Sequence, residues 1–346
     1  MKLGPLVVIG VCLLIAFIGL TTQIFIFWKF LGGFTLECMA ILGGFNILLG
    51  LLCYNFYLAC STDPGEVPPY WEPPKDPSKV LVIEVKKNNA GPRYCRTCKQ
   101  FKPPRSHHCS SCERCVLKMD HHCPWINNCV GYSNHGHFFR FIIYVDIASA
   151  YCLFFMCRRV WLIYAFRHDY NLYYQLEPKG TELLFLILNL ILDTLVLLLV
   201  GILTIYHTWL IFDNTTTIET MEIDRIRKMV RRRIVSDMEY PYDLGIIANF
   251  KQILGPNPWL WLWPQKMSYG GGTEFPIGSH LQPPVYWPPL QSTEYETPTV
   301  CTSSGNDVGR RHPTLSQTQH RTRGRQDAEA YALPTINSLV REQMTQ

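Results

Sequence analysis

Four long stretches of apolar residues dominate the chain and predict helices that cross a membrane. A helix needs about 20 apolar residues to cross a hydrocarbon layer roughly 30 Å thick. The first two stretches carry no charged side chain. A signal peptide would have a shorter apolar region and a cleavage site, and neither is clear in the first stretch. We therefore expect four membrane spans, at residues 3–28, 38–62, 138–166 and 183–212.

The third stretch is the least regular of the four. Its central part, residues 141–157, is only 17 residues long and contains Asp146. A buried amphipathic helix is the alternative reading of such a segment. The fourth stretch also contains an acidic residue, Asp193. Because ionisable residues inside a membrane usually pair or serve function, we expect Asp193 to pair with Arg158 or Arg159.

The basic residues are distributed unevenly between the loops. The loop over 61–137 holds eleven Lys and Arg residues, whereas the first short loop holds only Lys29. Positive residues favour the cytosolic side of a membrane, and four spans place both termini on one side. We therefore predict a multi-pass membrane protein whose long loop and both termini are cytosolic.

The segment after the fourth span is basic and then becomes polar. Residues 218–239 show an imperfect helical stripe, which fits either a helix on an anionic membrane surface or a solvated helix packed on the loop domain. Three tryptophans, Trp259, Trp261 and Trp263, are candidates for the headgroup level. Residues 267–346 are rich in Gly, Pro, Ser, Thr and Gln, which indicates a disordered tail.

These observations define the expected organisation, a membrane all-α protein with a cytosolic Cys-rich domain in its second loop. The composition agrees, because 48% apolar and only 17% charged residues exclude an all-soluble protein. The net charge of +5 is too mild to indicate nucleic acid as a partner. The expected regions are spans one and two (1–62), the loop (63–137, Cys-rich over about 93–137), spans three and four (138–212), a C-terminal region (213–266) and the tail (267–346).

Seven of the fourteen cysteines lie between Cys95 and Cys129, together with four histidines. Within this cluster the pattern C-x2-C-x9-H-x6-C occurs twice, displaced by 14 residues. Zinc in a structural site takes four S or N ligands, and three cysteines with one histidine are a common set. The cytosol is reducing, so metal ligands are favoured over disulfides. We predict two interlocked zinc sites, with ligands Cys95, Cys98, His108 and Cys115 in one and Cys109, Cys112, His122 and Cys129 in the other.

One cysteine of the cluster, Cys123, is left without a place in either set. It follows Asp120, His121 and His122 directly. A thiolate is a nucleophile, an imidazole can take its proton, and a carboxylate can orient that imidazole. Because His122 is assigned to zinc, we predict Cys123 as the nucleophile, His121 as its base and Asp120 as the orienting residue. A spare thiol, or a misassigned zinc ligand, is the alternative.

A nucleophilic cysteine beside a bilayer favours acyl transfer, because a long acyl chain gains about 0.8 kcal/mol for each methylene it buries. The small residues 148–150 would leave room for such a chain, or would simply allow close helix packing. Two other classes of protein compete with this interpretation. A membrane-anchored zinc interaction module, such as a RING-type ligase or adaptor, has no need of the unpaired Cys123 with His121 and Asp120. A transporter with a zinc loop would fit four spans, but no broken-helix pair indicates one.

The segment CRTCKQFKPPRSHHCSSCERCVLKMDHHCPWINNCVGYSNHGHF resembles the Cys-rich domain of the DHHC family of protein S-acyltransferases over its full length. Flanking motifs are similar too. They are Asp63-Pro64-Gly65 after span two, Thr216-Thr217-Ile218-Glu219 after span four, which looks like the family's TTxE motif, and Asn249 in a segment resembling its C-terminal motif. Within the family the chain looks most like the fungal endoplasmic-reticulum member.

The resemblance implies a palmitoyltransferase that works in two steps. Cys123 would take the acyl group from palmitoyl-CoA or another long-chain acyl-CoA and pass it to a cysteine of a substrate membrane protein. The two zinc ions would be structural, and Thr216, Thr217 and Asn249 would brace the site. An endoplasmic-reticulum location is implied as well. Arg96, Lys102 and Arg105 are candidates to contact the CoA phosphates, although a solvated role is the simpler reading for each. Substrate proteins, chain length and any accessory subunit are not specified by the residues.

Overall fold

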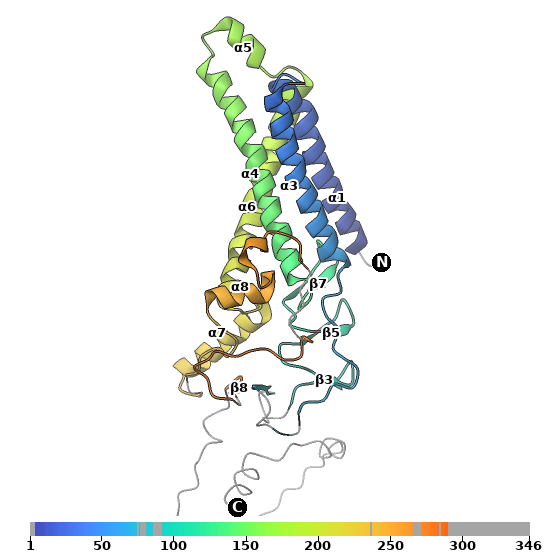
Figure 1. The fold of residues 1–346 in the computed structure, drawn as a ribbon, viewed down its shortest axis with the longest axis vertical. Helices are drawn as coiled ribbons and strands as arrows, with labels where there is room; N and C mark the ends of the chain where they lie inside the picture. The colour runs from blue at the N-terminus through green and yellow to red at the C-terminus, as the bar shows by residue number, and fades with distance from the viewer. Residues whose placement is uncertain are drawn as a thin grey trace, which may run out of the picture.

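The computed structural model describes residues 4–74, 76, 81–85, 92–235, 237–265, 271–283 and 285–289. Four long helices form an elongated bundle, and the Cys-rich domain lies at one of its ends (Figure 1). The first helix runs through α1 (Gly4–Thr21), the π-helix η1 (Thr22–Phe27) and α2 (Trp28–Phe30), and the others are α3 (Leu36–Ser61), α4 (His135–Ala165) and α6 (Thr181–Phe212). All four are long and apolar enough to cross a membrane, so the prediction of four spans is confirmed.

The segments outside the four long helices lie at the two ends of this bundle. The short helix α5 (Tyr170–Leu176) joins α4 to α6 at the end remote from the Cys-rich domain. The start of α1, the Cys-rich domain and the helices that follow α6 all lie at the other end (Figure 1). The two ends of the described chain are therefore on the same side of the four spans.

Helix α4 packs along both α3 and α6 and is the inner helix of the bundle. Half of its most apolar part is buried within the protein, compared with 17% or less for the other three spans. This position explains why α4 tolerates polar residues that a lipid-facing helix would expose to hydrocarbon. Its Arg140, for example, is fully buried and donates to the carbonyls of Leu254 (2.8 Å) and Trp261 (2.7 Å).

The prediction that Asp193 pairs with Arg158 or Arg159 is wrong. Arg159 pairs with Glu182 at 2.8 Å, and Arg158 lies 3.4 Å from Glu37. Both arginines are near the end of α4 that is remote from the Cys-rich domain, where Glu37 in the first turn of α3 and Glu182 in the first turn of α6 reach them. Asp193 is instead 1% exposed, and its Oδ2 has no hydrogen-bond partner within the described ranges.

The Cys-rich domain consists of three small antiparallel hairpins. They are β2 (Tyr94–Cys95) with β3 (Gln100–Phe101), β4 (His107–Cys109) with β5 (Arg114–Val116), and β6 (His121–Cys123) with β7 (Asn128–Val130). The last two have the same register, with His108 opposite Cys115 in one and His122 opposite Cys129 in the other. The repeat of 14 residues in the sequence is thus a repeat of hairpins.

Two asparagines tie the Cys-rich domain to the end of α3. Asn128 Nδ2 donates to the carbonyls of Ala59 (3.3 Å), Cys60 (3.2 Å) and Thr62 (2.9 Å). Asn134 Nδ2 donates to Ala59 as well, at 3.3 Å. The last carbonyls of a helix have no partner within the helix, so these bonds satisfy α3 and fix the third hairpin against the bundle.

Of the residues that the structure describes after α6, most belong to the helices α7 and α8, a 3-10 turn, a strand and the segments between them. Helix α7 (Thr217–Arg231) is shorter than the predicted 218–239 segment and begins with a capping box made by Thr216 and Glu219. Helix α8 (Ile246–Leu254) packs on α4 and α6, and the 3-10 turn η3 (Pro258–Leu260) follows it. Trp259 is 94% exposed and Trp263 60% exposed, so their placement at the headgroup level stays a prediction.

The ordered chain continues past the predicted boundary of the tail. Strand β8 (Val285–Trp287) pairs in parallel with β1 (Val82–Glu84), and Trp287 is buried in a cluster with Tyr242 and Phe275. These contacts with β1 and with the C-terminal region, which composition does not reveal, place residues 271–283 and 285–289 in the fold. The rest of the predicted tail lies outside the described residues.

Candidate functional site

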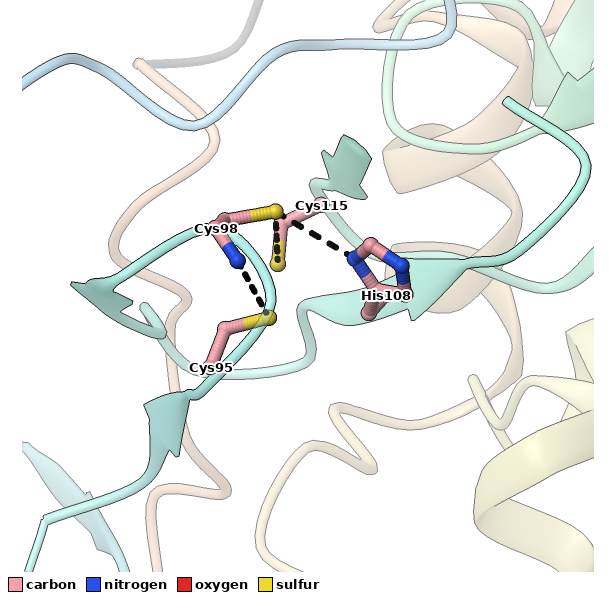
Figure 2. A group of neighbouring side chains, drawn as sticks. All are labelled: Cys95, Cys98, His108 and Cys115. Carbon is pink, nitrogen blue, oxygen red and sulfur yellow. Dashed lines mark hydrogen bonds between the residues drawn. The ribbon is translucent and has the colours of Figure 1, made fainter. Parts of the chain in front are cut away.

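The first predicted set of metal ligands meets between two hairpins (Figure 2). The atoms that can bind a metal in Cys95, Cys98, His108 and Cys115 all lie within 4.8 Å of one another. Cys98 Sγ is 3.2 Å from His108 Nδ1 and 3.8 Å from Cys115 Sγ. The Cys98 amide donates to Cys95 Sγ at 3.4 Å, so the backbone itself turns around the first ligand.

The second set has nearly the same geometry one hairpin further along. Cys109, Cys112 and Cys129 place their sulfurs 3.7, 3.5 and 3.6 Å from His122 Nδ1. The Cys112 amide donates to Cys109 Sγ at 3.4 Å, as in the first set. The structure therefore groups the eight residues as the repeat in the sequence pairs them.

Both donor sets fit zinc. With bonds of about 2.3 Å to sulfur and 2.0 Å to nitrogen, a tetrahedral zinc ion has ligands about 3.5 to 3.8 Å apart. The distances in both sets are close to this range. Zinc bound there would cross-link segments of a domain that has little apolar interior, which is the role of a closed structural site.

Cys123 occupies the ligand position of a third, incomplete repeat. It ends strand β6 as Cys95 ends β2 and Cys109 ends β4, each 14 residues apart. Three residues after Cys95 and Cys109 comes a second cysteine, but after Cys123 the corresponding residue is the buried Ile126. Cys123 is thus held by the same backbone geometry as a zinc ligand, but in neither of the two metal sets.

Cys123 lies at the wall of a cavity of about 350 Å³ that runs into the helix bundle. Side chains from α1, α3, α4 and α6 all line this cavity, and nearly all of them are apolar. On α4 the lining extends from Phe138 to Cys152, which at 1.5 Å per residue is about 21 Å along the helix. The polar lining residues Ser149, Cys152 and Asp193 lie together at the end remote from Cys123.

His121 and Asp120 are directly connected. His121 Nδ1 lies 2.5 Å from Asp120 Oδ2, which places a proton between them and leaves the other ring nitrogen for Cys123. Burial alone would lower the pKa of His121, but the bond to Asp120 and the interaction with Cys123 raise it to about 9. Asp120 therefore stabilises the protonated imidazole that forms when His121 accepts a proton.

Asp120 is fully buried and receives donors from a distant part of the chain. Thr217 gives it two hydrogen bonds, from its backbone N–H to Oδ1 (2.8 Å) and from its hydroxyl to Oδ2 (3.0 Å). Burial by itself would raise the pKa of Asp120, but the bond with His121 and the nearby imidazoles hold it below its usual value. The carboxylate thus stays ionised inside the protein.

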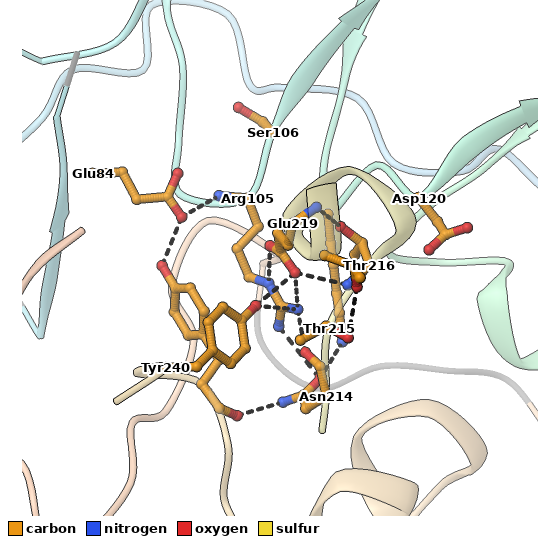
Figure 3. A network of polar contacts seen from close by, with 12 residues as sticks. Glu84, Arg105, Ser106, Asp120, Asn214, Thr215, Thr216, Glu219 and Tyr240 are labelled. Carbon is orange, nitrogen blue, oxygen red and sulfur yellow. Dashed lines mark hydrogen bonds and ion pairs between the residues drawn. The ribbon is translucent and has the colours of Figure 1, made fainter. Parts of the chain in front are cut away.

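A buried ion pair joins the Cys-rich domain to α7 (Figure 3). The Arg105 guanidinium makes two bonds of 2.7 Å to the two carboxylate oxygens of Glu219, and both side chains are almost completely buried. Tyr240 also donates to Glu219, at 2.6 Å. Glu219 in turn accepts from the Thr216 amide at 2.9 Å, which fixes the start of α7 and so the position of Thr217.

Asn214 and Lys118 extend this network toward the site. Lys118 Nζ donates to Asn214 Oδ1 at 3.0 Å, and Arg105 Nη2 donates to the Asn214 carbonyl at 2.6 Å. Burial and the neighbouring Arg105 lower the pKa of Lys118 well below its usual value. The reading of Arg105 as a solvated or CoA-facing residue was wrong, because it is 1% exposed and bound to Glu219.

Asn249, the remaining residue of the predicted site, lies behind the site rather than in it. Its Nδ2 donates to the Phe212 carbonyl at 2.6 Å and to Asp243 Oδ1 at 2.7 Å, and its Oδ1 accepts from the Leu244 amide at 2.9 Å. These bonds hold the end of α6 against α8. Asn249 therefore fixes the last residue of α6, which precedes Thr216 and Thr217 by a short turn.

Two histidines next to His121 were not predicted from the sequence. His207, on α6, has its ring centre 5.6 Å from that of His121, and His135 lies 6.2 Å from His207. Both rings are almost completely buried. His207 is 86 positions after His121 within an apolar run, so nothing local to the sequence signals the contact.

Comparisons with known proteins agree with this geometry. The family model described as DHHC palmitoyltransferase matches residues 88–224. The chain is 41% identical to palmitoyltransferase PFA4 of Mycosarcoma maydis over 80% of its own length, and 36% identical to palmitoyltransferase pfa4 of Aspergillus fumigatus over 83%. It is also 35% identical to the probable protein S-acyltransferase 16 of Arabidopsis thaliana over 66%. The matches span 62%, 69% and 77% of these relatives.

The metal sets predict how zinc content responds to substitution. We expect Cys95→Ser and His122→Ala each to lower bound zinc by at least one equivalent per chain and to lower the unfolding temperature, because each removes one of four ligands. Metal analysis of the protein purified in detergent measures this. Cys157→Ser, an exposed cysteine on α4, is the control and should keep both equivalents. Equal losses in all three variants would contradict the assignment.

The bond from the Thr217 hydroxyl predicts the reactivity of Cys123. Thr217→Val removes the 3.0 Å bond to Asp120 but keeps the backbone bond. A hydrogen bond to a charged group contributes about 1.5–3 kcal/mol, so we expect alkylation of Cys123 by iodoacetamide to slow by about tenfold or more. Peptide mass spectrometry at neutral pH follows the rate. Thr220→Val removes a hydroxyl that bonds Thr215 at 3.3 Å, and this variant should react like the unmodified protein. Equal rates in both variants would argue against the coupling.

Proposed function

Because the chain belongs to the DHHC palmitoyltransferase family, we propose that it is a protein S-acyltransferase. It transfers a long-chain acyl group, such as palmitoyl, from acyl-CoA to cysteine thiols of membrane proteins. The observation that carries this proposal is the position of Cys123. This thiol lies at the wall of an apolar cavity built by all four spans. Next to it, hydrogen bonds connect His121 to Asp120 and Asp120 to Thr217.

In the first half of the reaction Cys123 becomes acylated. His121 holds the proton of the Cys123 thiol, and the thiolate attacks the carbonyl carbon of the thioester. The bond between that carbon and the CoA sulfur breaks, and the CoA thiolate takes the proton from His121. The acyl chain meanwhile occupies the cavity, where each buried methylene contributes about 0.8 kcal/mol.

In the second half the acyl group leaves Cys123. His121 accepts the proton of the substrate thiol, whose sulfur attacks the acyl carbon, and Cys123 departs as a thiolate that regains the proton. Asp120, held ionised by Thr217, keeps His121 in one orientation in both halves. Zinc, when bound by the two Cys/His sets, supplies cross-links that hold the β6–β7 hairpin.

The surroundings follow from the same proposal. The many basic residues of the 61–137 loop favour a cytosolic position for the Cys-rich domain and both termini. The resemblance to the fungal endoplasmic-reticulum member favours that membrane. The partners are then acyl-CoA, the bilayer and membrane proteins with cytosolic cysteines. A zinc interaction module without catalysis is the alternative, but such a module would not need a cavity that ends at Cys123.

The acyl-enzyme is the direct test of this function. The protein, purified in detergent, is incubated with alkyne-tagged palmitoyl-CoA, and we expect a label on Cys123 that neutral hydroxylamine removes. Cys123→Ser should carry no label while it retains two zinc equivalents. An unlabelled but folded and zinc-loaded wild type would favour the zinc module, and loss of zinc from Cys123→Ser would show that Cys123 is a metal ligand.

The cavity predicts the accepted chain length. Ala148 lines it about ten residues, or roughly 15 Å, along α4 from Phe138. We expect the larger side chain of Ala148→Phe to fill the far half of the cavity, because Ala148 lines this free volume directly. Palmitoyl transfer should fall at least tenfold relative to decanoyl transfer. Ala150→Phe, on an exposed face of α4, is the control and should leave the ratio of the two rates unchanged.

A further inference from the structure

A third group of potential metal ligands lies at the junction of the Cys-rich domain and the bundle. It consists of Asp120, His121 and His207, whose ligand atoms all lie within 4.8 Å of one another. His121 begins β6, the first strand of the third hairpin, and Asp120 directly precedes that strand. His207 lies on α6. None of the three belongs to the two Cys/His sets described above.

The imidazoles at this place have unused nitrogens. His207 is 1% exposed, and its Nδ1 has no hydrogen-bond partner among the described residues. His135, whose ring centre is 6.2 Å from that of His207, is 2% exposed, and neither of its nitrogens has a hydrogen-bond partner in the part of the chain that the structure describes. A buried polar group without a partner costs free energy, so these nitrogens favour any ligand that can bind them.

The donor atoms select the class of ligand. Imidazole nitrogen and carboxylate oxygen together suit Zn²⁺ and similar first-row divalent ions, whereas Mg²⁺ and Ca²⁺ prefer oxygen alone. We propose that Asp120, His121 and His207 form a third metal site, which binds Zn²⁺ reversibly and inhibits the enzyme.

Binding at this site should be weaker than at the two structural sets. The third set contains no cysteine and only three protein ligands, an arrangement that leaves one position of a tetrahedral ion to water. Ligands of one zinc ion are about 3.4 Å apart when the bonds are about 2.1 Å long, so the three side chains must approach one another. In addition, both oxygens of Asp120 already accept bonds from Thr217.

Inhibition follows from the position of His121. One of its nitrogens bonds Asp120, and the other serves Cys123 in the proposed reaction. A metal ion on either nitrogen removes one of these two connections, and His121 then no longer accepts the proton of the thiol. The inhibition thus rests on the proposed function, but the binding of metal does not.

The test uses the full chain in detergent with its two structural zinc ions, exposed to buffered concentrations of free Zn²⁺. We expect a third equivalent to bind, and the initial rate of Cys123 acylation by palmitoyl-CoA to fall over the same concentration range. In His207→Gln the third equivalent should be absent, and half-inhibition should need at least tenfold more free Zn²⁺, each rate being taken relative to the same variant without added zinc. His168→Gln, an exposed histidine beyond α4, should behave as the wild type.

Two further measurements separate the possible failures. Cys123→Ser forms no acyl-enzyme but should still bind the third equivalent, which tests the metal site even where the proposed activity fails. Zinc X-ray absorption of the wild type needs no variant at all. The number of sulfur ligands per zinc should fall from three to two as the third ion binds, because the third set contains no cysteine.

Several results would overturn the proposal. They are the absence of a third equivalent in the folded wild type, a third equivalent and inhibition that persist unchanged in His207→Gln, or a sulfur count that stays at three. His207→Asp, which returns an oxygen ligand at that position, should regain the third equivalent that His207→Gln lacks. Its failure to do so in a protein that retains both structural zinc ions would also count against the site.

Discussion

The interleaving of two metal-ligand sets is the constraint on which the rest of the site depends. The buried apolar residues of the Cys-rich domain are few and lie directly beside the ligand cysteines, as Leu117 does beside Cys115 and Val116 beside Cys129. Such a segment gains little from apolar burial, so the cross-links between hairpins must fix its shape. The ligands His122 and Cys129 fix the third hairpin as part of the second metal set. The hairpin therefore holds Cys123 and His121 in defined positions.

The bundle and the Cys-rich domain then meet around one thiol. Asn128 and Asn134 hold the third hairpin on the end of α3, while Arg105 and Glu219 hold the same domain on α7. A buried pair of this kind is not in itself strong evidence of stability, because its desolvation cost is large. What it does is determine position. Glu219 caps the start of α7, and the cap places Thr217 within reach of Asp120.

Features that depend on neighbouring residues can be predicted from the sequence, whereas contacts between residues far apart along the chain cannot. The spans are predictable from apolar runs, and the ligand sets from spacing within 35 residues. The partner of Arg105 is 114 positions away, and His207 sits in a run that reads only as a span. Asp193 shows the same limit, because its place at the end of a cavity depends on how α4 and α6 pack, and charge pairing alone suggested a different neighbour.

The contact between Thr217 and Asp120 also has a consequence for how the protein is made. The two residues are 97 positions apart, and both α4 and α6 lie between them. A ribosome therefore delivers the cysteines and histidines of the metal sets well before the donor that keeps Asp120 in place. During synthesis the Cys123 thiol and the Asp120 carboxylate are already present before Thr217, which follows the last span, can bond to Asp120. The order of translation thus keeps this chemistry incomplete until insertion of the chain is finished.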